Sequence, residues 1–318
     1  MPSLKQPRSG SLQFYPRVRA EKFLPRVNWR PIPKKSEKET VLGIIAYKVG
    51  MATAIVKDMT EKVLSSGKQI PIPVTILEVP QMKIYAIRFY KNNIPFKDIV
   101  VTNDRILKKV VRIPKTLPSL EASIPSEYDD VHILIYTLVN TTSIKKTPDI
   151  AEIAITAPNK QEFVKALTKR EISLSDFLRD NLIDIRGITI GKGTQGPVKR
   201  FGISLKQHKS EKGVRRPGSL GPWHPARVTF RAPLAGQLGF FSRIAYNSYI
   251  ITAGKIAEKD INPIAGFRDY GKIKTSYLLV KGSVMGPPKR QLLLTHAFRK
   301  THNQEKRKYQ FIELITGA

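Results

Sequence analysis

Short runs of β-branched and aromatic residues, separated by glycine or proline, recur along much of the chain. Ile and Val dominate the first of these runs, at 41–47, 53–56 and 73–79. Runs of this length, bounded by turn residues, are typical of β-strands. The pattern therefore predicts a mainly β fold. Further runs of the same kind lie at 85–90, 99–102, 132–138, 182–190, 249–252, 273–280 and 291–295.

A helical period is evident only in the middle of the chain. Residues 159–169 carry an apolar stripe of Phe163, Ala166 and Leu167. This i, i+3, i+4 spacing places the three side chains on one face of a helix. Asn159 stands at the N-cap, a position that asparagine favours. We therefore expect a helix over this range.

A second, shorter helix is expected over 173–179, with Ser175 and Asp176 near its start. Both helices fall in the stretch 116–185, which has eleven acidic residues against seven basic ones. The rest of the chain is strongly basic. An acidic stretch in such a chain indicates a lobe that faces solvent, away from a polyanionic partner.

The first 35 residues show little periodicity. They carry nine Lys and Arg, one acidic residue, and prolines throughout. Such a segment cannot bury enough apolar surface to fold by itself. We expect an extended basic arm that folds against a partner.

Lysine and arginine outnumber the acidic residues by 55 to 25, which gives a formal net charge of +30 and an isoelectric point near 10.2. A field of this sign raises the local concentration of polyanions, and nucleic acid is the usual partner. An anionic membrane is the second choice. A membrane-surface binder, however, normally concentrates its charge on an amphipathic helix, and the sequence shows none.

The chain shows no sign of a membrane span or a leader. No apolar run reaches the length of about 18 residues that a span needs. The N-terminus lacks the apolar stretch of a secretory signal, and its four prolines would break the amphipathic helix of a transit peptide. The absence of cysteine excludes disulfides and cysteine-based zinc sites. We expect a cytoplasmic protein with neither a membrane nor a small-molecule substrate as partner.

The segment 186–243 departs most from the strand-like pattern. It has twelve Lys and Arg, one acid (Glu211) and ten of the chain's 20 glycines. Like charges repel and few large apolar side chains are available, so this segment is not expected to build a core by itself. Its order should come largely from a ligand. Aromatic rings and imidazoles are interleaved with the charges at Phe201, His208, Trp223, His224, Phe230, Phe240 and Phe241.

RNA is the ligand that fits this combination best. Lys and Arg neutralise phosphates and release counterions, while Trp, Phe and His stack on unpaired bases. Contacts to about eight to ten phosphates would give log affinity a slope of roughly −6 to −9 against log salt. Trp223 is the sharpest candidate, because Gly221–Pro222 and His224–Pro225 place it on a stiff turn. A solvated flexible loop, or a core tryptophan, is the plainer alternative.

Residues 191–196 match G-x-G-x-x-G after a predicted strand, which is the fingerprint of a dinucleotide-binding loop. That fold needs a helix to begin here, within a parallel βαβ unit. Pro197 is instead followed by 198–203, which has strand or loop character, so a dinucleotide site is disfavoured. A phosphate-binding P-loop is also disfavoured, since Gly187 is one residue too close and a glycine follows Lys192.

No other pattern indicates an enzyme. The histidines show no H-E-x-x-H, the serines show no G-x-S-x-G, and carboxylates are nearly absent where the glycines and aromatics gather. The leading hypothesis is an RNA-scaffolding protein that is not an enzyme. An RNA-modifying enzyme with 191–196 as its cofactor loop is the main alternative. A DNA-binding regulator would need a recognition helix, and the basic segment shows none.

Two segments of the basic stretch, 191–202 and 213–226, resemble large-subunit ribosomal protein L three in its archaeal and eukaryotic branch, and an archaeal member is expected. The segment 191–202, Gly-Lys-Gly-Thr-Gln-Gly-Pro-Val-Lys-Arg-Phe-Gly, is similar to the hallmark of this family. The segment 213–226, which contains Trp223, is similar to its loop tip. The resemblance continues in consistent order at 8–14, 148–155, 235–239, Arg243, 263–267, 270–271, 281–287 and 289–290.

The resemblance implies a structural constituent of the large ribosomal subunit. The implied fold is a split β-barrel of the translation-protein type with an α/β insertion, a long extended loop and an extended N-terminal arm. The implied partners are large-subunit rRNA and neighbouring large-subunit ribosomal proteins. The family further implies a role in early subunit assembly. Its loop tip, here Trp223, would approach the peptidyl transferase centre without being the catalyst.

Composition and resemblance together divide the chain into an arm, a barrel in two parts and an insertion. The arm is expected at 1–38, the first part of the barrel at 39–80 and the inserted lobe at 81–181. The second part of the barrel, with a basic and mixed C-terminal tail, is expected at 182–318. The RNA-penetrating loop is expected at about 192–243.

The residues expected to bind RNA are cations, aromatic rings and imidazoles of the arm, the loop and one later basic pair. Trp223 and His224 are expected to act at the loop tip. No cofactor is expected, apart from structural Mg²⁺ or K⁺ ions bound through rRNA. The full set is Arg8, Arg17, Arg19, Arg26, Arg30, Lys192, Lys199, Arg200, Phe201, His208, Lys209, Lys212, Arg215, Arg216, Trp223, His224, Arg227, Arg231, Arg243, Lys289 and Arg290.

Overall fold

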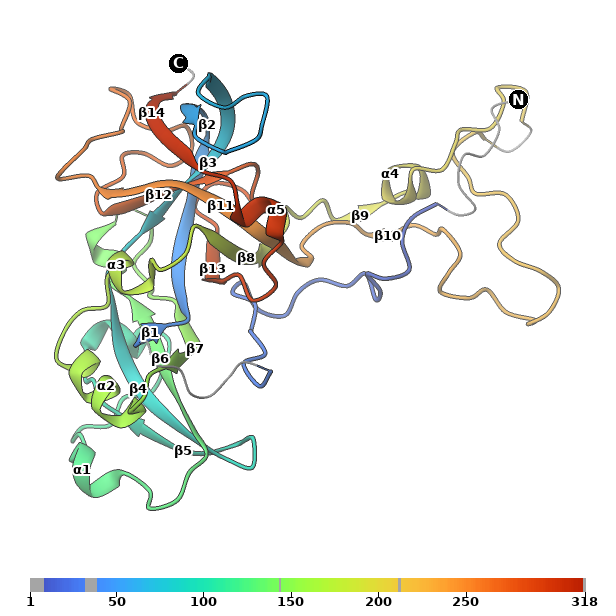
Figure 1. The fold of residues 1–318 in the computed structure, drawn as a ribbon. Helices are drawn as coiled ribbons and strands as arrows, with labels where there is room; N and C mark the ends of the chain where they lie inside the picture. The colour runs from blue at the N-terminus through green and yellow to red at the C-terminus, as the bar shows by residue number, and fades with distance from the viewer. Residues whose placement is uncertain (1–8, 32–38, 143, 211–212, 317–318) are drawn as a thin grey trace. The chain divides into compact units, whose positions relative to one another are not determined.

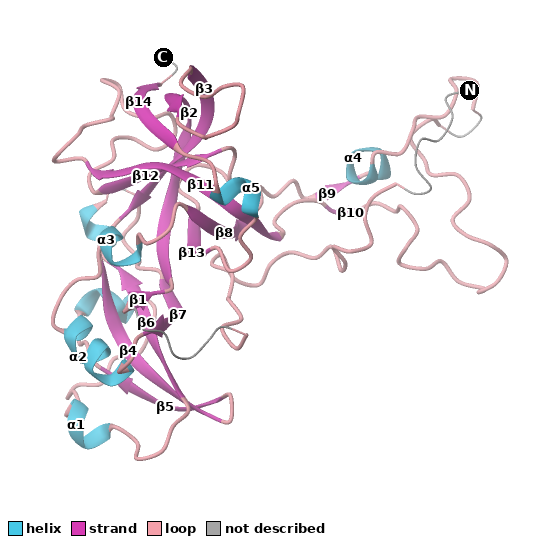
Figure 2. Ribbon diagram, viewed as in Figure 1, coloured by secondary structure: helices cyan, strands magenta, loops and turns pink. Residues whose placement is uncertain are grey.

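The computed structural model describes residues 9–31, 39–142, 144–210 and 213–316. Strands dominate it, so the mainly β fold is confirmed, and Figure 2 shows how few helical turns accompany them. The chain forms two compact units. One, here called the body, consists of 23–187 and 243–318, and the other, here called the basic unit, consists of residues up to 22 together with 188–242.

The body contains a sheet of seven strands in the order β13-β8-β11-β12-β3-β2-β14 (Figure 1). β13 also pairs with β2, so the pairings run in a closed circuit through every strand of the sheet except β14. The strands are β2 (Gly43–Asp58), β3 (Gln69–Val79), β8 (Leu182–Ile188), β11 (Ser242–Lys255), β12 (Ser276–Lys281), β13 (Gln291–His296) and β14 (Tyr309–Ile315).

A second sheet of the body has five strands in the order β1-β7-β6-β4-β5. Its strands are paired antiparallel throughout. The helix α2 (Lys160–Thr168) lies against β4 and β6. The strands are β1 (Thr40–Val41), β4 (Met82–Lys91), β5 (Ile94–Val100), β6 (Asp130–Thr137) and β7 (Ile150–Thr156).

β2 differs from its prediction. The apolar runs 41–47 and 53–56 predict separate strands, but residues 43–58 form one strand. Its register against β3 shifts between Lys48 and Gly50, so the glycine lies at a bulge and not at a turn. A bulge bends a strand without ending it, and β2 pairs with β3, β13 and β14 along its length. The strands β7 and β14 were not predicted, and β14 lies where a mixed tail was expected.

The predicted helix at 159–169 is confirmed as α2, which begins after Asn159. Its buried side chains are Phe163, Val164 and Leu167, whereas Ala166 is exposed. The predicted stripe was therefore wrong at Ala166. Burial of the larger Val164 side chain is more favourable than burial of the single methyl group of Ala166. The buried face of α2 is therefore rotated about the helix axis toward Val164.

The second predicted helix is present in a shorter form, as α3 (Leu174–Phe177). It begins with a capping box, in which Ser173 and Asp176 satisfy backbone groups of the first turn in both directions. Four further helical turns of the body were not predicted: η1 (Arg105–Lys109), α1 (Leu120–Ser123), η2 (Val139–Thr141) and α5 (His302–Glu305).

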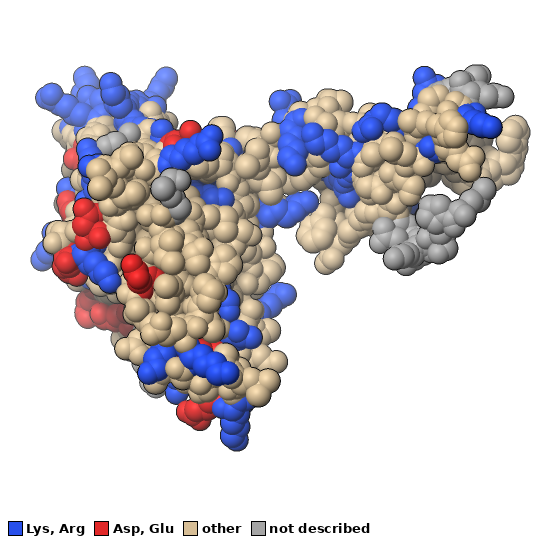
Figure 3. Space-filling model, turned by 90° about the horizontal axis from the view of Figure 1, so that it is seen from above, with Lys and Arg blue, Asp and Glu red and all other residues tan. Residues whose placement is uncertain are grey.

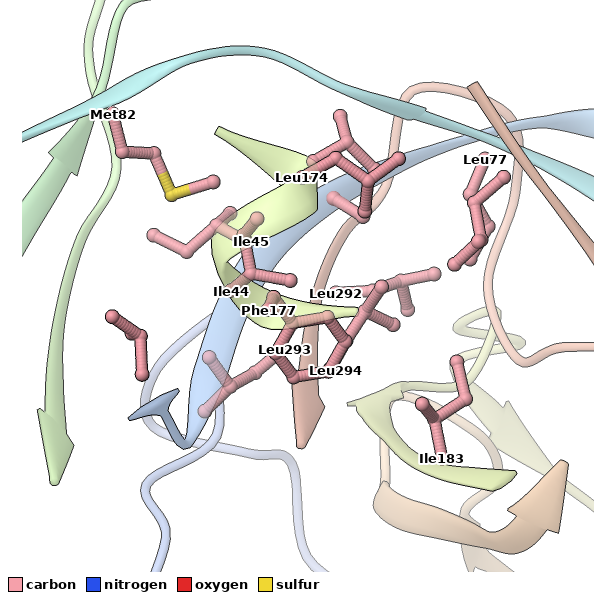
Figure 4. Close-up of a cluster of buried hydrophobic side chains, with 14 of the residues drawn as sticks. Ile44, Ile45, Leu77, Met82, Leu174, Phe177, Ile183, Leu292, Leu293 and Leu294 are labelled. Carbon is pink, nitrogen blue, oxygen red and sulfur yellow. The ribbon is translucent and has the colours of Figure 1, made fainter. Parts of the chain in front are cut away.

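The core of the body draws on both sheets and on α3. Figure 4 shows Ile44 and Ile45 of β2 near Phe177 of α3 and Leu293 of β13. Each of these side chains is at most 1% exposed. Successive side chains of a strand point to opposite faces, so the burial of both isoleucines shows that β2 is covered on both sides. The body therefore has a core of its own.

A charged cluster is enclosed in the smaller sheet. His132 of β6 is 7% exposed, with its Nδ1 2.8 Å from Glu152 Oε1 and its Nε2 3.6 Å from Asp130 Oδ2. Burial acts to lower the pKa of His132, but the facing carboxylates of Asp130 and Glu152 raise it above its ordinary value. Burial acts to raise the pKa of both carboxyl groups, but hydrogen bonds from His132, Lys160 and Tyr90 lower each to about 2.

We expect His132→Gln to destabilise the body most at mildly acid pH. A histidine with a raised folded-state pKa contributes stability that is fully present below 6.5 and is lost as the pH rises through the folded-state value. The carboxylates, with a lowered pKa, lose their contribution only as the pH falls toward 2. The substitution should cost about 1–3 kcal/mol at about pH 5.5 and less at about pH 9, as measured by urea unfolding. Equal losses at both pH values would contradict a charged His132.

Candidate nucleic-acid interface

The basic unit is organised around a short antiparallel stem. β9 (Thr194–Gln195) pairs with β10 (Gly236–Gln237). Beyond these strands the pairing continues, and the Thr189 N–H donates to the Phe241 carbonyl at 3.0 Å. The outgoing and returning limbs of the basic segment therefore run side by side at its base.

The residues after the glycine-rich motif form a helix, where a strand or loop was predicted. α4 (Pro197–Phe201) has proline at its first position, where the missing N–H costs nothing and the fixed φ suits a helix. Gly202, with φ +68°, ends it in the left-handed conformation. The helix has five residues, and β9 before it pairs antiparallel with β10. A dinucleotide site needs a helix between parallel strands, so the motif here builds the stem.

Phe201 anchors a small core within the basic unit. Its side chain is 7% exposed. The guanidinium carbon of Arg17 lies 4.3 Å from the ring centroid and that of Arg200 lies 5.0 Å from it. Cations over an aromatic face are attracted by its charge distribution. The structure thus places the Phe201 ring against guanidinium groups of the protein itself, in a segment whose composition predicts no core.

Arg200 and Arg17 join the parts of this unit through backbone carbonyls. Arg200 donates from Nε to Gln237 O at 3.0 Å and from Nη1 to Leu234 O at 2.9 Å. Arg17 donates from Nη1 to Arg200 O at 2.9 Å. Burial, and then the neighbouring charge of Arg17, lower the pKa of Arg200. These two arginines therefore hold the arm, the helix and the returning limb together.

Residues 9–22 of the arm contact the returning limb at two more places. The Ala20 N–H donates to the Phe240 carbonyl at 2.9 Å. The Tyr15 ring meets the Phe230 ring edge-on, with 5.4 Å between centroids. The sequence did not predict a role for Tyr15 or its contact with Phe230, because no local pattern links residues so far apart. Residues 9–22 of the arm therefore belong to one folded unit with the loop, whereas residues 23–31 belong to the body.

Between α4 and β10 the described residues form no helix or strand. Trp223 lies in this part of the chain and is 88% exposed, which rules out a role in a core. It borders a shallow hollow of about 400 Å³ together with Leu220, Pro222, Arg227 and Val228. An exposed indole beside a guanidinium and a hollow is an arrangement on which an unpaired base can stack.

The charge of the basic unit is almost entirely of one sign. Among its described residues Glu21 is the one acid. Figure 3 shows basic side chains along this unit, while the acidic side chains on the face drawn lie on the body. Because few carboxylates neutralise these cations, the surface potential of the basic unit stays positive. A surface with such a potential attracts polyanions.

Most residues of the predicted RNA-binding set come together in the basic unit. Phe201 is buried and Arg17 and Arg200 are half-buried, for the reasons given above. The remaining members in this unit are all exposed: Arg19, Lys192, Lys199, His208, Lys209, Arg215, Arg216, Trp223, His224, Arg227 and Arg231.

The other members of the set lie elsewhere. Arg8 and Lys212 fall outside the described residues. Arg26 and Arg30 are exposed on the body, next to the buried Trp29, whose Nε1 donates to Glu152 O at 3.1 Å. The three remaining members, also in the body, are Arg243, Lys289 and Arg290.

Lys289 lies in a segment of the body that hydrogen bonds hold in place. Its N–H donates to Lys48 O at 2.7 Å, and Lys48 Nζ donates to Val284 O at 2.6 Å and to Gly286 O at 2.8 Å. Lys289 is exposed and has φ +66°, a left-handed conformation that costs a residue with a side chain about 1–2 kcal/mol. Such strain is typical of functional positions.

Positive charge, aromatic faces and backbone groups are what the basic unit offers to a partner. Within the described ranges, no group of three or more His, Cys, Asp or Glu residues could hold a metal ion. None of the described helices is long and apolar enough to cross a membrane.

Comparison with known proteins places this architecture in a family. The family model for ribosomal protein L3 matches residues 1–102 and 109–315. The chain belongs to the ribosomal protein L3 family. The large ribosomal subunit protein uL3 of Methanococcoides burtonii is 35% identical over 92% of each chain. The uL3 proteins of Methanoregula boonei (36% identical over 94% of each chain) and Methanocaldococcus jannaschii (36% identical over 93% of this chain and 92% of its own) are similarly close.

Membership of the L3 family confirms the resemblance carried by the glycine-rich segment and the loop tip. The match covers both the body and the basic unit. These relatives are archaeal, as the sequence predicted. They are ribosomal proteins and not enzymes, so the prediction of a non-enzyme is confirmed and the cofactor-loop alternative is set aside.

Proposed function

We propose that this chain is a structural constituent of the large ribosomal subunit and binds large-subunit rRNA directly through the basic unit. The exposed, nearly acid-free set of cations in that unit carries the proposal. Each cation that meets a phosphate releases condensed counterions, which drives binding without regard to sequence. Exposed aromatic rings add contacts to unpaired bases. The exposed and strained Lys289 of the body adds a further phosphate contact.

The loop at about 192–243 would run through rRNA and carry its tip toward the peptidyl transferase centre. Trp223 and His224 would act at this tip, by positioning RNA or tRNA and not by catalysis. The stem and the Phe201 core support this assignment, because a tip can position a partner only if its base is held. The cations of the flanking limbs would anchor the loop.

The same surfaces suit a protein that joins the subunit early. A cationic arm and loop can bind rRNA segments before other proteins cover them, which would support early assembly in the cytoplasm. Neighbouring large-subunit proteins would contact the body. Any Mg²⁺ or K⁺ near the chain would be held through rRNA phosphates, and no small molecule or membrane is required.

The finer fold assignments follow from the same family. We propose a split barrel of the translation-protein type, supported by the closed circuit of strand pairings. Its first part would be 39–80 and its second part 182–318, with 81–181 inserted between them as an α/β lobe. Residues 1–38 would form the arm.

Co-sedimentation tests this function together with the role of the tip. In cells of a tractable archaeon, we expect the tagged wild-type chain and Trp223→Ala to co-sediment equally with large subunits and to resist a high-salt wash. Trp223→Ala should instead alter tRNA binding or sensitivity to drugs of the peptidyl transferase site. A wild-type chain that stays free of large subunits would refute the proposal. Failed assembly of the variant with normal translation would refute the assigned tip.

A further inference from the structure

A groove in the basic unit lies between the arm and the stem. Residues 17–20 form one wall, and Gly193, Thr194, Gln237 and Phe240 form the other. Its volume of about 900 Å³ falls within the roughly 300–1,000 Å³ of pockets that hold small-molecule ligands. Among the described residues, the lining includes two arginines and no carboxylate. The groove is therefore large enough for a nucleotide and has the charge to attract a phosphate.

The two arginines of this groove are held differently. Arg17 is fixed by its position over the Phe201 ring and by its hydrogen bond to Arg200 O. Arg19 is exposed, two residues along the same wall. Directly after Arg19, the Ala20 N–H donates to Phe240 O and holds the arm against the stem. One arginine thus builds the wall, and the other is available to a ligand.

Phe240 carries the second, independent sign of a binding site. It has φ +58°, directly after Gly239 with φ +74°. The left-handed conformation is unfavourable for phenylalanine and free of that penalty for glycine. Two backbone hydrogen bonds hold Phe240 in this conformation. The Ala20 N–H donates to Phe240 O, and the Phe240 N–H donates to Ile190 O at 3.4 Å. Side chains kept in such conformations cluster at ligand sites, and this ring stands on the groove wall.

We propose that the groove binds one unpaired nucleotide of the rRNA, with its base against the Phe240 ring and its phosphate at Arg19. The inference rests on the proposed rRNA binding and adds where and how a single strand is gripped. An unpaired strand is favoured, because a duplex presents phosphates but hides its base faces from a ring. Every base has a π-face, so little sequence preference is expected. The bound nucleotide would bridge the arm and the stem.

Fluorescence anisotropy with the full-length chain tests this site. The probes are a labelled oligouridine of about ten nucleotides and a labelled, fully paired RNA duplex with the same number of phosphates. Phe240→Gly removes the ring and relieves the strained φ. It should weaken oligouridine binding by about five- to one-hundred-fold while the melting temperature stays unchanged or rises.

Arg19→Gln should weaken oligouridine binding severalfold and make the salt slope shallower by about 0.7. Arg112→Gln is the matched control, since it removes the same charge from an exposed position on the body. It should leave the oligouridine affinity within about twofold of the wild-type value. The affinity for the duplex should not change in Phe240→Gly.

The outcomes separate the groove from the wider function. Equal losses for oligouridine and duplex, or no loss in either groove variant, would overturn the nucleotide site and leave the proposed rRNA binding standing. A fall in both binding and melting temperature in Phe240→Gly would make the ring structural and overturn base stacking. A wild-type chain that binds neither probe would overturn both proposals.

Discussion

Neutralising six exposed cations of the basic unit should lower the affinity for large-subunit rRNA by about a thousandfold at physiological salt. Each cation that meets a phosphate contributes through counterion release, and the contributions add in the logarithm of the binding constant. Arg17 and Arg200 are left unchanged, because they hold the stem through carbonyls. The six substitutions to glutamine are at Lys192, Lys199, Lys206, Lys209, Arg215 and Arg216, all exposed.

The salt dependence is the sharper measurement. If all six side chains contact phosphates, log affinity against log salt should lose about five units of slope. Filter binding of a large-subunit rRNA fragment over a range of salt concentrations gives both the affinity and the slope. Far-ultraviolet circular dichroism and the melting temperature should be unchanged, since none of these side chains lies in a core.

A matched control separates local contacts from net charge. It removes the same four lysines and two arginines from exposed positions on the body, so the net charge falls equally. We expect its salt slope to stay within about one unit of the wild-type slope. Equal losses in the two variants would mean that net charge, and not the basic unit, drives binding. The control positions are Lys62, Lys68, Lys97, Arg105, Lys108 and Arg112.

The fold was predictable from sequence wherever its cause is local. β-branched runs and the period of α2 mark their own elements, because the signal lies within the residues that form each element. α4 shows where this fails. Val198 and Ile203 favour a strand, yet Pro197 at the first position and the left-handed Gly202 define a helical turn. The residues at the two ends of α4 indicated a helix, but the prediction gave more weight to the β-branched residues, which favour a strand.

The candidate site was predictable in its charge and only partly in its construction. Scarcity of acids and the spacing of aromatics are properties of the segment itself, so they can be read directly. The packing of Phe201 cannot, because its partner Arg17 lies in the arm, and Arg17 bonds a residue 183 positions away. The left-handed φ of Phe240 is likewise held by backbone hydrogen bonds with distant residues, Ala20 of the arm and Ile190 of the outgoing limb. Contacts between residues far apart in the sequence therefore determine which basic residues stabilise the fold of the segment and which remain exposed to a ligand.

Glu78→Ala should destabilise the body more than any other single substitution considered for it. Glu78 of β3 is 1% exposed. Its Oε1 accepts hydrogen bonds from Lys274 N at 2.9 Å, Thr275 N at 3.1 Å and Thr275 Oγ1 at 2.9 Å, and its Oε2 accepts one from the Tyr270 hydroxyl. Burial, and then the charge of Glu78, raise the pKa of Tyr270 well above its ordinary range, so the phenol remains a donor.

Removing this carboxylate leaves two backbone N–H groups and the hydroxyls of Tyr270 and Thr275 without this acceptor. Each unsatisfied buried group costs about 1–3 kcal/mol, and some would regain water, so we expect a loss of about 3–5 kcal/mol. That is a large part of the roughly 5–15 kcal/mol by which native proteins are stable. For a unit of this size the melting temperature should fall by about 8–15 °C. Urea unfolding and calorimetry measure the two quantities.

Two further variants show whether the acceptor is what matters. Glu313→Ala removes an exposed glutamate from β14 and should change stability by less than about 0.5 kcal/mol. Glu78→Gln keeps one acceptor oxygen and should fall between the alanine variant and wild type. If Glu78→Ala cost no more than Glu313→Ala, the carboxylate would not be holding the segment 270–275. Tyr270 lies 192 positions from Glu78 in the sequence. The loss of unfolding free energy therefore measures a long-range interaction within the body that no local sequence pattern could have indicated.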